Sequence, residues 1–211
     1  MSVDLAPLFG LRLGTPRLEL RLPSDEELLR LRDVALAGIH PPEFMPFTVA
    51  WTDDPELANF LPYHELRRRE WSPDDWHLEL GVWLEGEPAG VQVVHGVEFA
   101  RTRSVMTGSW LGQRFQGRGV GTEMRTAVLE LAFRGLGAEV ANSGAIDGNA
   151  ASLAVSRKLG YRHVGRSTVT SRGEAVGHAD LALRRHEWRP PFPVEILGLE
   201  PCLPLFGAAQ S

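Results

Sequence analysis

The chain has 211 residues, of which 43% are hydrophobic, and a formal net charge of −5. This length fits one domain with a short appendage, and the acidic balance argues against a nucleic-acid partner. No apolar run approaches the roughly 20 residues of a membrane span, and the N-terminal sequence lacks the basic flank of a signal peptide. The single cysteine, Cys202, cannot form an internal disulfide, so we expect a cytoplasmic protein.

The first part of the chain predicts one strand and two helices. Residues 15–22 alternate leucine with charged side chains, as a half-buried strand does. Residues 24–38 open with a capping-box serine and glutamate and close with a glycine, which predicts a helix. Residues 39–52 contain three prolines and predict a loop. Residues 54–69 predict a second helix, with a proline at its first position and a bend at Pro62.

The next part of the chain is dominated by strand patterns. Residues 77–84 and 90–97 flank a turn and predict an antiparallel hairpin. Residues 104–111 predict a central strand, and residues 138–146 predict the strand that follows it in the chain. A long helix, from residue 120 to about Arg134, connects the two, so we expect them to be parallel neighbours.

The last predicted elements complete an α+β fold. Asn149 is a good N-cap for a helix over residues 150–159, which Gly160 ends. Residues 161–166 and 178–183 predict the final two strands. This order predicts a mixed, mostly antiparallel central sheet with helices on both faces.

A glycine-rich turn lies between the central strand and the long helix, in the sequence QRFQGRGVG of residues 113–121. Gly117, Gly119 and Gly121 carry no side chains, so a ligand can approach the backbone closely. The first N–H groups of a helix have no partner within it, and the helix dipole adds positive charge there. The turn therefore predicts an anion site, most often one for phosphate.

Three phosphate-binding motifs compete for this turn. A P-loop needs Gly-Lys-Ser/Thr, and the turn has no lysine. A dinucleotide fingerprint needs G-x-G-x-x-G directly after a strand near the start of its domain, whereas these glycines run G-x-G-x-G and come later. The third candidate is a site for the pyrophosphate of coenzyme A.

Residues 116–121 resemble the Q/R-x-x-G-x-G/A signature of the GNAT N-acyltransferase family. Residues 15–21 look like the T-x-R-L-x-L-R opening of its RimJ/RimL-like branch, and residues 108–111 resemble the G-Y-W-L segment of that branch. Residues 149–161 resemble its N-x-x-S-x-x-V-x-x-K-L-G-F/Y pattern. The resemblance covers residues 15–188 and implies the GNAT fold and acetyl-CoA as the co-substrate.

The same resemblance implies where the cofactor binds. In the family, the two parallel strands splay apart, and pantetheine binds between them like an added strand; Gly108 and Gly144 suit such a break. The residues expected to contact the cofactor are Ser109, Trp110, Leu111, Gln116, Gly117, Arg118, Gly119, Val120, Gly121, Thr122 and Asn149. For Asn149, a role as a plain N-cap is the alternative.

Two catalytic residues are expected. The RimJ/RimL branch uses a serine at the position of Ser152, which implies that Ser152 protonates the leaving sulfur; the alternative is a small residue that accommodates CoA. Glu43, in the proline-rich loop, is the candidate general base. The other candidates for this role are His40, Glu79, His95 and Glu98. No histidine and cysteine cluster has metal-ligand spacing, so we expect no metal.

The proline-rich loop also predicts an acceptor pocket. It carries Phe44, Met45, Phe47 and Trp51, and we expect Trp71 and Trp76 to join the same apolar wall. Such a wall suits an amine with an apolar body. The alternative is a scaffold loop that packs beside the sheet.

Together these features predict an acyl-CoA-dependent N-acyltransferase that acts on a primary amine of a small molecule or a peptide. A catalytically silent acyl-CoA-binding module is the alternative. Residues 1–188 would form the GNAT domain, and residues 189–211 a proline-rich, apolar arm. We expect the arm to pack on the body or on a second subunit, which favours a homodimer, and we expect no nucleic-acid or membrane partner.

Overall fold

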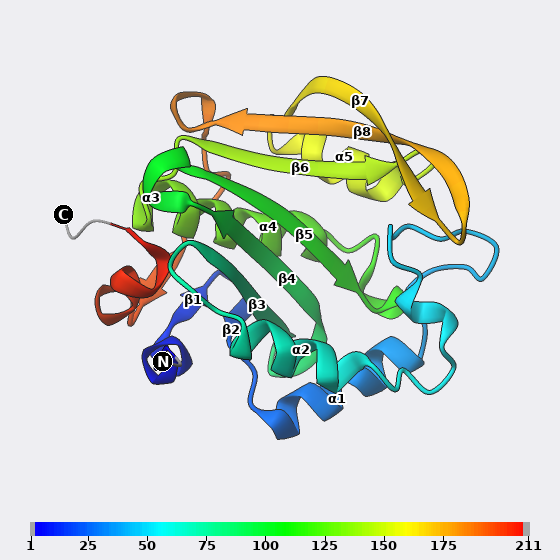
Figure 1. Cartoon of the computed structure of the whole chain (residues 1–211), viewed down its shortest axis with the longest axis horizontal. Coiled ribbons are helices and arrows are strands. Elements are labelled where there is room, and N and C mark those ends of the chain that lie inside the picture. The colour runs from blue at the N-terminus through cyan, green and yellow to red at the C-terminus, as the bar shows by residue number, and fades with distance from the viewer. Residues whose placement is uncertain (1–2, 209–211) are drawn as a thin grey trace.

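The computed structural model describes residues 3–208, which form a mixed sheet with helices on both faces. Its strands are β1 (Arg12–Gly14), β2 (Leu18–Arg21), β3 (Asp75–Leu84), β4 (Glu87–Val97), β5 (Ser104–Leu111), β6 (Val140–Ile146), β7 (Arg162–Ser171), β8 (Glu174–Arg184) and β9 (Glu195–Leu197). They lie in the order β7-β8-β6-β5-β4-β3-β2-β1-β9 (Figure 1). Only the β5–β6 pair is parallel among these neighbours. The predicted α+β class and mostly antiparallel sheet are confirmed.

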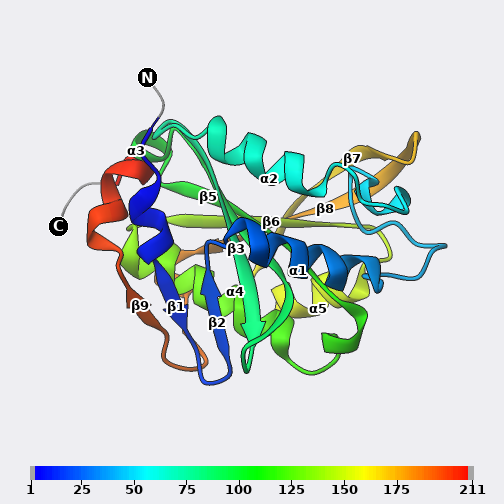
Figure 2. The same ribbon diagram turned by 90° about the horizontal axis from the view of Figure 1, so that it is seen from below.

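The helices are α1 (Asp25–Leu36), α2 (Phe60–Arg69), α3 (Phe99–Thr102), α4 (Val120–Glu130) and α5 (Ala150–Lys158). Short 3-10 or π turns are η1 (Ala6–Gly10), η2 (Trp51–Asp53), η3 (Gln113–Phe115), η4 (Leu131–Gly135), η5 (Arg185–Glu187) and η6 (Glu200–Phe206). Helices α1 and α2 cover one face of the sheet, and α4 and α5 lie on the other (Figure 2). Between residues 3 and 208, no helix combines the length and apolarity needed to cross a membrane.

The first helix forms as predicted, and the second begins later than predicted. The Ser24 hydroxyl accepts from the N–H of Glu27, whose carboxylate accepts from the N–H of Ser24, so the capping box of α1 is present. In the segment before α2, the carboxylate of Asp54 accepts the N–H of Ala58 at 2.7 Å, which favours a local turn over a helix. The predicted helix start at Asp54 is therefore wrong. Pro62 lies in the first turn of α2, where its missing N–H removes no helical hydrogen bond.

The two hairpins form with tighter turns and longer strands than predicted. Strands β3 and β4 are joined by Glu85 and Gly86 alone, both with positive φ, at 53° and 84°. Strands β7 and β8 are joined by Arg172 and Gly173, at 49° and 79°. Such turns match the twist of the flanking strands. Because β7 and β8 are long, the tip of their hairpin extends beyond the sheet toward the proline-rich loop (Figure 1).

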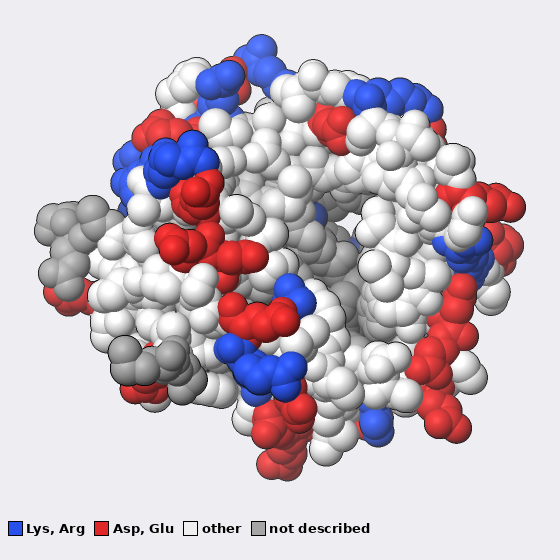
Figure 3. Space-filling model, in the orientation of Figure 1, with Lys and Arg blue, Asp and Glu red and all other residues white. Residues whose placement is uncertain are grey.

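Strands β5 and β6 are paired at one end only. Residues 104–106 of β5 lie opposite residues 140–142 of β6, and the pairing then stops. Beyond this point β5 remains paired with β4, and β6 remains paired with β8. Gly108 and Gly144 are the second residues after the last pair, as expected for a break between the strands. The face of the molecule is hollowed here (Figure 3).

The C-terminal arm packs on its own chain. Strand β9 adds to the edge of the sheet beside β1, and the Phe206 side chain in η6 is completely buried. The indole N–H groups of Trp71 and Trp76 donate to the carbonyls of Leu205 and Phe206, at 2.9 and 3.2 Å. The last three residues of the arm lie outside the described range. A homodimer stays a prediction, but these apolar side chains no longer supply the reason for it.

Candidate active site

The glycine-rich turn leaves a row of backbone N–H groups free at the start of α4. Gly117 and Gly119 have φ of 71° and 83°, which glycine adopts without strain. Within residues 3–208, the N–H groups of residues 117–121 have no hydrogen-bond partner, whereas those of Thr122 and Glu123 both bond to the carbonyl of Gly119 at 3.1 Å. A methyl group placed on Gly117 would meet nothing within 4 Å, so the turn is open. Free amides at a helix N-terminus fit a pyrophosphate.

Arg17, directly before β2, holds this turn through its side chain. Its Nε atom donates to Oε2 of Glu123 at 2.7 Å, its Nη2 atom lies 2.5 Å from the same oxygen, and its Nη1 atom donates to the carbonyl of Arg118 at 3.2 Å. The Thr15 hydroxyl donates to the other oxygen of Glu123 at 2.7 Å. Since Glu123 is only 4% exposed, these bonds supply the partners that its buried charge needs.

The side chain of Gln116 is used inside the protein. Its Nε2 atom donates to the carbonyls of Ile39 and Leu111, at 2.7 and 2.8 Å. Its backbone N–H donates to the carbonyl of Gln113 at 3.1 Å. These bonds tie the end of β5 and the beginning of the proline-rich loop to the turn. Gln116 can therefore shape the site without contacting a ligand, and its contact with the cofactor stays a prediction.

A buried arginine lies beneath the point where β5 and β6 separate. Arg125 extends from α4 and is 4% exposed. Its guanidinium donates to the hydroxyls of Ser109 on β5 and Ser143 on β6, at 3.2 and 3.0 Å, and to Oε1 of Gln92 at 3.4 Å. All three acceptors are neutral, and no carboxylate of the described chain pairs with Arg125. The guanidinium of Arg125 thus places a positive charge beneath the gap.

Helix α5 flanks the glycine-rich turn. A Cγ atom of Val155 lies 3.5 Å from the position that a Cβ on Gly121 would occupy. Asn149 caps the helix, because its Oδ1 accepts the N–H of Ser152 at 3.1 Å. Ser152 is half-buried, whereas Ser156, one turn later, is completely buried and its hydroxyl has no partner among the described residues. Ser152 is therefore the more accessible of the two hydroxyls.

An aromatic wall stands on the face of the sheet that carries α1 and α2. Trp51 is at its centre, with ring centroids 5.5 Å from Phe47, 6.0 Å from Phe60 and 5.9 Å from Trp110. Phe47 and Trp51 come from the proline-rich loop, as predicted, while Trp110 belongs to β5. Phe44 lies apart, against Gly148.

Trp71 and Trp76 are not part of this wall, so that prediction is wrong. Their rings pack on Phe206, with centroid distances of 5.6 and 4.9 Å. Successive residues of a strand face opposite sides of a sheet, and Trp76 lies in the core cluster on the α4 side with Leu78. Sequence proximity to α2 did not reveal which face Trp76 occupies.

The proline-rich loop is fastened to the tip of the β7–β8 hairpin. Arg172 binds the carboxylate of Asp53 through two hydrogen bonds, of 2.9 and 2.5 Å, and donates to the carbonyl of Pro42 at 3.0 Å. The Ser171 hydroxyl donates to the carbonyl of Phe47 at 2.7 Å. The hydrogen bonds from Arg172 lower the pKa of Asp53 and keep it ionised. This clasp joins the proline-rich loop to the β7–β8 hairpin.

The predicted general bases have different surroundings. Glu43 is exposed in the loop, and its role stays a prediction. Both ring nitrogens of His40 are engaged, Nε2 with the Thr52 hydroxyl at 2.7 Å and Nδ1 with the Pro41 carbonyl at 2.9 Å. Glu98 lies at the start of α3 and pairs with Arg101.

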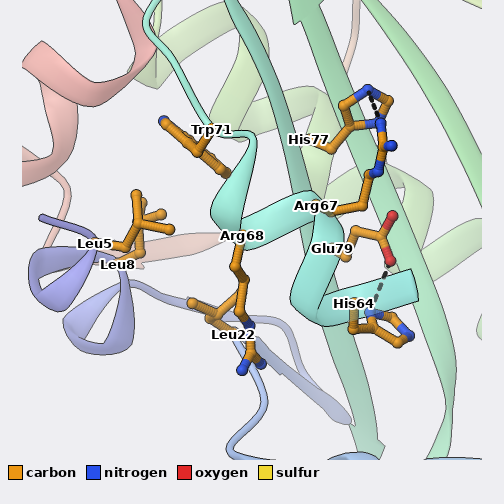
Figure 4. A pocket seen from close by; sticks show the side chains of 9 residues that line it. All are labelled: Leu5, Leu8, Leu22, His64, Arg67, Arg68, Trp71, His77 and Glu79. Carbon is orange, nitrogen blue, oxygen red and sulfur yellow. Dashed lines mark hydrogen bonds and ion pairs between the residues drawn. The ribbon is translucent and has the colours of Figure 1, made fainter. Parts of the chain in front are cut away.

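Glu79 is buried under α2, on the far side of β4 from the gap. Its Oε2 lies 2.8 Å from Nδ1 of His64, beside a cavity of about 10 Å³ between η1, α2 and β3 (Figure 4). This is roughly the space of one water molecule. Burial, together with the charge of Glu79, raises the pKa of Tyr63. The cavity and its polar groups are separate from the β5–β6 gap.

His95 belongs to a cluster that the sequence spacing hides. Its ring stacks on that of His77 across the β3–β4 pair, with centroids 3.7 Å apart, and its Nε2 atom lies 2.9 Å from Oδ1 of Asp75. The three side chains place potential metal ligands within 4.8 Å of one another. However, a guanidinium nitrogen of Arg67 lies 3.4 Å from Nε2 of His77, and this positive charge opposes a second cation.

Two polar residues near the gap were missed by the sequence analysis. His178 and Asp180 on β8 bond to each other, with Nδ1 2.9 Å from Oδ1. The sequence could have shown that these two side chains are neighbours, because alternate residues of a strand face the same side of the sheet. Their position beside β6, however, depends on the strand register, which puts Gly144 opposite Asp180.

Residues 17–162 match the family model described as an acetyltransferase (GNAT) domain. The chain belongs to the GNAT acetyltransferase family. This membership confirms the predicted family, and acetyl-CoA or CoA is the expected co-substrate of a GNAT acetyltransferase. The free amides at residues 117–121 and the gap between β5 and β6 fit that group.

Solved GNAT structures share the fold at low sequence identity. Mycobacterium smegmatis RimJ in complex with CoA-disulfide is 19% identical, with a TM-score of 0.66 over 84% of this chain and 88% of that one. RimL, a ribosomal L7/L12 alpha-N-protein acetyltransferase in complex with coenzyme A, is 17% identical, with a TM-score of 0.64 over 81% and 95%. The microcin C7 self-immunity acetyltransferase MccE, in complex with acetyl-CoA and AMP, is 15% identical, with a TM-score of 0.65 over 81% and 93%.

Proposed function

We propose that this GNAT-family acetyltransferase transfers an acyl group from acetyl-CoA to a primary amine. The main support is one continuous arrangement: free amides at the start of α4, followed by the unpaired edges of β5 and β6, with an aromatic wall on the face above them. The identity of the amine, the acyl group and the residues that contact them belong to this proposal.

The cofactor would lie along this arrangement. The N–H groups of residues 117–121 would hold the pyrophosphate, with Thr122 and the exposed Arg118 beside it. The backbone of residues 109–111 faces the gap after its last pairing with β6, so it would bind the pantetheine arm as an added strand. Asn149 would border the same gap from the start of α5.

The acceptor would be an amine with an apolar body, either a small molecule or the end of a peptide. The wall around Trp51 consists of four aromatic rings, which offer an apolar surface to the body of such an amine. The clasp between Arg172 and Asp53 fixes the proline-rich loop, which carries Phe47 and Trp51, against the β7–β8 hairpin. A narrow acceptor therefore fits better than a folded surface. RimL is named for a ribosomal protein and MccE for self-immunity to microcin C7. Structural similarity to both therefore does not decide between a peptide and a small-molecule acceptor.

The reaction forms a C–N bond to the thioester carbonyl carbon and breaks its C–S bond. The sulfur leaves as a thiolate, and we assign Ser152 to donate a proton to it, directly or through water, with solvent restoring the serine hydroxyl. The amine must lose a proton for the amide to form, and Glu43 is the acceptor of that proton expected from the sequence alone. The cytoplasmic location and the homodimer remain part of this proposal.

The test uses the wild-type chain, acetyl-CoA and a panel of amines that spans peptides with free N-termini and small aromatic amines. Thiol release and the mass of the product are measured together. Amine-dependent thiol release with an acetylated product supports the proposal. Binding of acetyl-CoA without transfer to any amine would instead favour the silent acyl-CoA-binding module.

A further inference from the structure

The imidazole of His178 occupies the place of a missing side chain on β6. A Cβ atom added to Gly144 would lie 2.1 Å from Cε1 of His178 and 2.5 Å from its Nε2. Real Cβ atoms do not approach other atoms so closely, so the ring can rest there only because residue 144 is a glycine. Gly144 is thus needed to leave space for the His178 ring, in addition to its place at the break in the sheet.

This contact places the ring on the open face of the sheet. Ser143 points toward α4, because its hydroxyl accepts from Arg125. Its neighbour Gly144 therefore faces the other side, together with Met106 and Trp110 on β5. That is the face that carries the aromatic wall, and Figure 3 shows it hollowed. The ring stands at the rim of the gap, two residues beyond the last β5–β6 pair.

The hydrogen bonds around the ring fix its tautomer. Oδ1 of Asp180 lies 2.9 Å from Nδ1 of His178 and also accepts from the Ser167 hydroxyl at 2.9 Å. A carboxylate only accepts hydrogen bonds, so the hydrogen of a neutral imidazole resides on Nδ1. The lone pair is then on Nε2, the atom that lies over Gly144. The bonds from His178 and Ser167 lower the pKa of Asp180, which keeps this carboxylate ionised.

We propose that His178 is the general base that takes the proton of the attacking amine on Nε2, with Asp180 as its positioning residue. This inference rests on the proposed acyl transfer. At neutral pH the bound substrate is an ammonium ion, so one of its N–H bonds breaks first, its proton moves to Nε2, and the freed lone pair forms the C–N bond. The nitrogen of the tetrahedral adduct then loses its second proton to solvent as the C–S bond breaks. The proton on Nε2 also passes to solvent, while the thiolate obtains its proton separately, from Ser152.

The other candidate bases are less well placed for this step. Glu79 is paired with His64 beneath α2, and Nε2 of His95 is bound to Asp75. Glu43 is exposed, with no partner that fixes its orientation among the described residues. Of these candidates, within residues 3–208, only His178 combines a fixed ring, a nitrogen without a hydrogen-bond partner and a position at the rim of the gap.

The charges around His178 come from three segments. Asp180 lies on β8 itself, and His163 and Arg166 come from the neighbouring strand β7. Asp147 follows β6 and pairs with Arg166. The charges of Asp147 and Arg166 offset each other. Asp180 is the charged group that bonds directly to the imidazole.

The experiment compares His178→Ala with the wild type on an amine that the wild type acetylates. General-base catalysis contributes about 100-fold or more, so kcat/KM should fall by that order at neutral pH. Activity should return at a pH above the pKa of the amine, because the substrate is then already deprotonated. Added imidazole should also restore part of the rate, which a purely structural role would not produce.

Asp180→Asn should lower kcat with a smaller change in KM, since the ring remains but loses its orientation. His186→Ala, at an exposed histidine outside the site, is the matched control and should leave the rate unchanged. If His178→Ala unfolds more easily, His178→Gln replaces it, because its amide can still donate to Asp180. Thermal unfolding of each variant separates loss of fold from loss of the base.

An unchanged kcat/KM in His178→Ala or His178→Gln, with an active wild type, would overturn the assignment and leave the proposed function intact. The same conclusion follows if Glu43→Gln, rather than the His178 variants, shows the loss at neutral pH and the recovery at high pH. A wild type that releases no CoA with any amine is a failure of the proposed function itself.

Discussion

Arg17 and Glu123 stand 106 residues apart and form a two-point ion pair between the sheet and the first turn of α4. Arg17 belongs to the T-x-R-L-x-L-R segment that resembles the RimJ/RimL branch. Its guanidinium also reaches the carbonyl of Arg118, in the glycine-rich turn. The segment therefore has a physical role in this chain, which is to hold the turn in place.

Replacing Arg17 by glutamine should destabilise the protein. The carboxylate of Glu123 would remain buried without its cationic partner, at a cost of about 1.5–3 kcal/mol in the free energy of unfolding. Arg12→Gln removes a more exposed pair, with Glu19 at 3.6 Å, and should cost less than about 1 kcal/mol. Urea unfolding measures both. The double variant Arg17→Gln/Glu123→Gln should recover most of the loss, and a double variant no more stable than Arg17→Gln would contradict this account.

Ser152→Ala should lower kcat far more than it changes the KM for acetyl-CoA, if the hydroxyl acts on the leaving thiolate. Ser156→Ala is the matched control on the same helix. Its hydroxyl is buried without a partner, so alanine removes an unsatisfied polar group and should be neutral or stabilising. Steady-state kinetics and thermal unfolding separate the two effects. Equal kinetic losses in both variants would count against the role of Ser152.

The sequence predicted those helices and strands that depend on interactions between residues close together in the chain. Residues 104–111 form the expected strand, and the capping box of α1 is present because its hydrogen bonds lie within one turn. Strands β1 and β9 have three residues each, too few for an alternating pattern to show. The late start of α2 depends on hydrogen bonds of one side chain, Asp54, which compete with the helix signal.

The candidate site was only partly predictable for a different reason. The glycine-rich turn is contiguous in sequence, so its anion-binding geometry could be inferred directly. The contact between His178 and Gly144 depends instead on the register of β6 and β8. Similarly, Trp76 was expected in the aromatic wall because it follows α2 closely in the sequence, and the pattern of β3 alone does not say which of its faces meets α2.

His77 should make the protein less stable in mild acid. Burial, then the neighbouring His95 and Arg67, lowers its pKa to about 4 in the folded state, from 6.5 in an unperturbed histidine. The unfolded chain therefore binds the proton first, and stability is lost as the pH falls from about 6.5 toward about 4. The contribution of neutral His77 is complete above that window.

The measurement is urea unfolding at several pH values across this window. His77→Gln should flatten the acid side of the stability curve, because the group with the lowered pKa is gone. His186→Gln, at an exposed histidine, should leave the curve unchanged. A His77→Gln curve that falls as steeply as that of the wild type would show that other groups cause the acid sensitivity.

The C-terminal arm should contribute strongly to stability. Phe206 is completely buried against Trp71 and Trp76, so Phe206→Ala should cost about 3–5 kcal/mol. Val164→Ala, at a side chain that is 63% exposed, is a control and should change stability by about 0.5 kcal/mol or less. Chemical unfolding of both variants provides the comparison. A negligible effect of Phe206→Ala would mean that the arm does not pack as described.

The central claim is that the turn at the start of α4 holds the pyrophosphate of an acyl-CoA. Thermal unfolding of the wild type, Arg118→Glu and Arg30→Glu, each with and without CoA, tests it most directly. CoA at about 100 times its Kd should stabilise the wild type by about 2.7 kcal/mol. Arg118→Glu should lose most of this stabilisation, because it puts a negative charge beside the free amides, while Arg30→Glu on the exposed side of α1 should keep it. Equal stabilisation of all three proteins, or none in the wild type, would contradict the account.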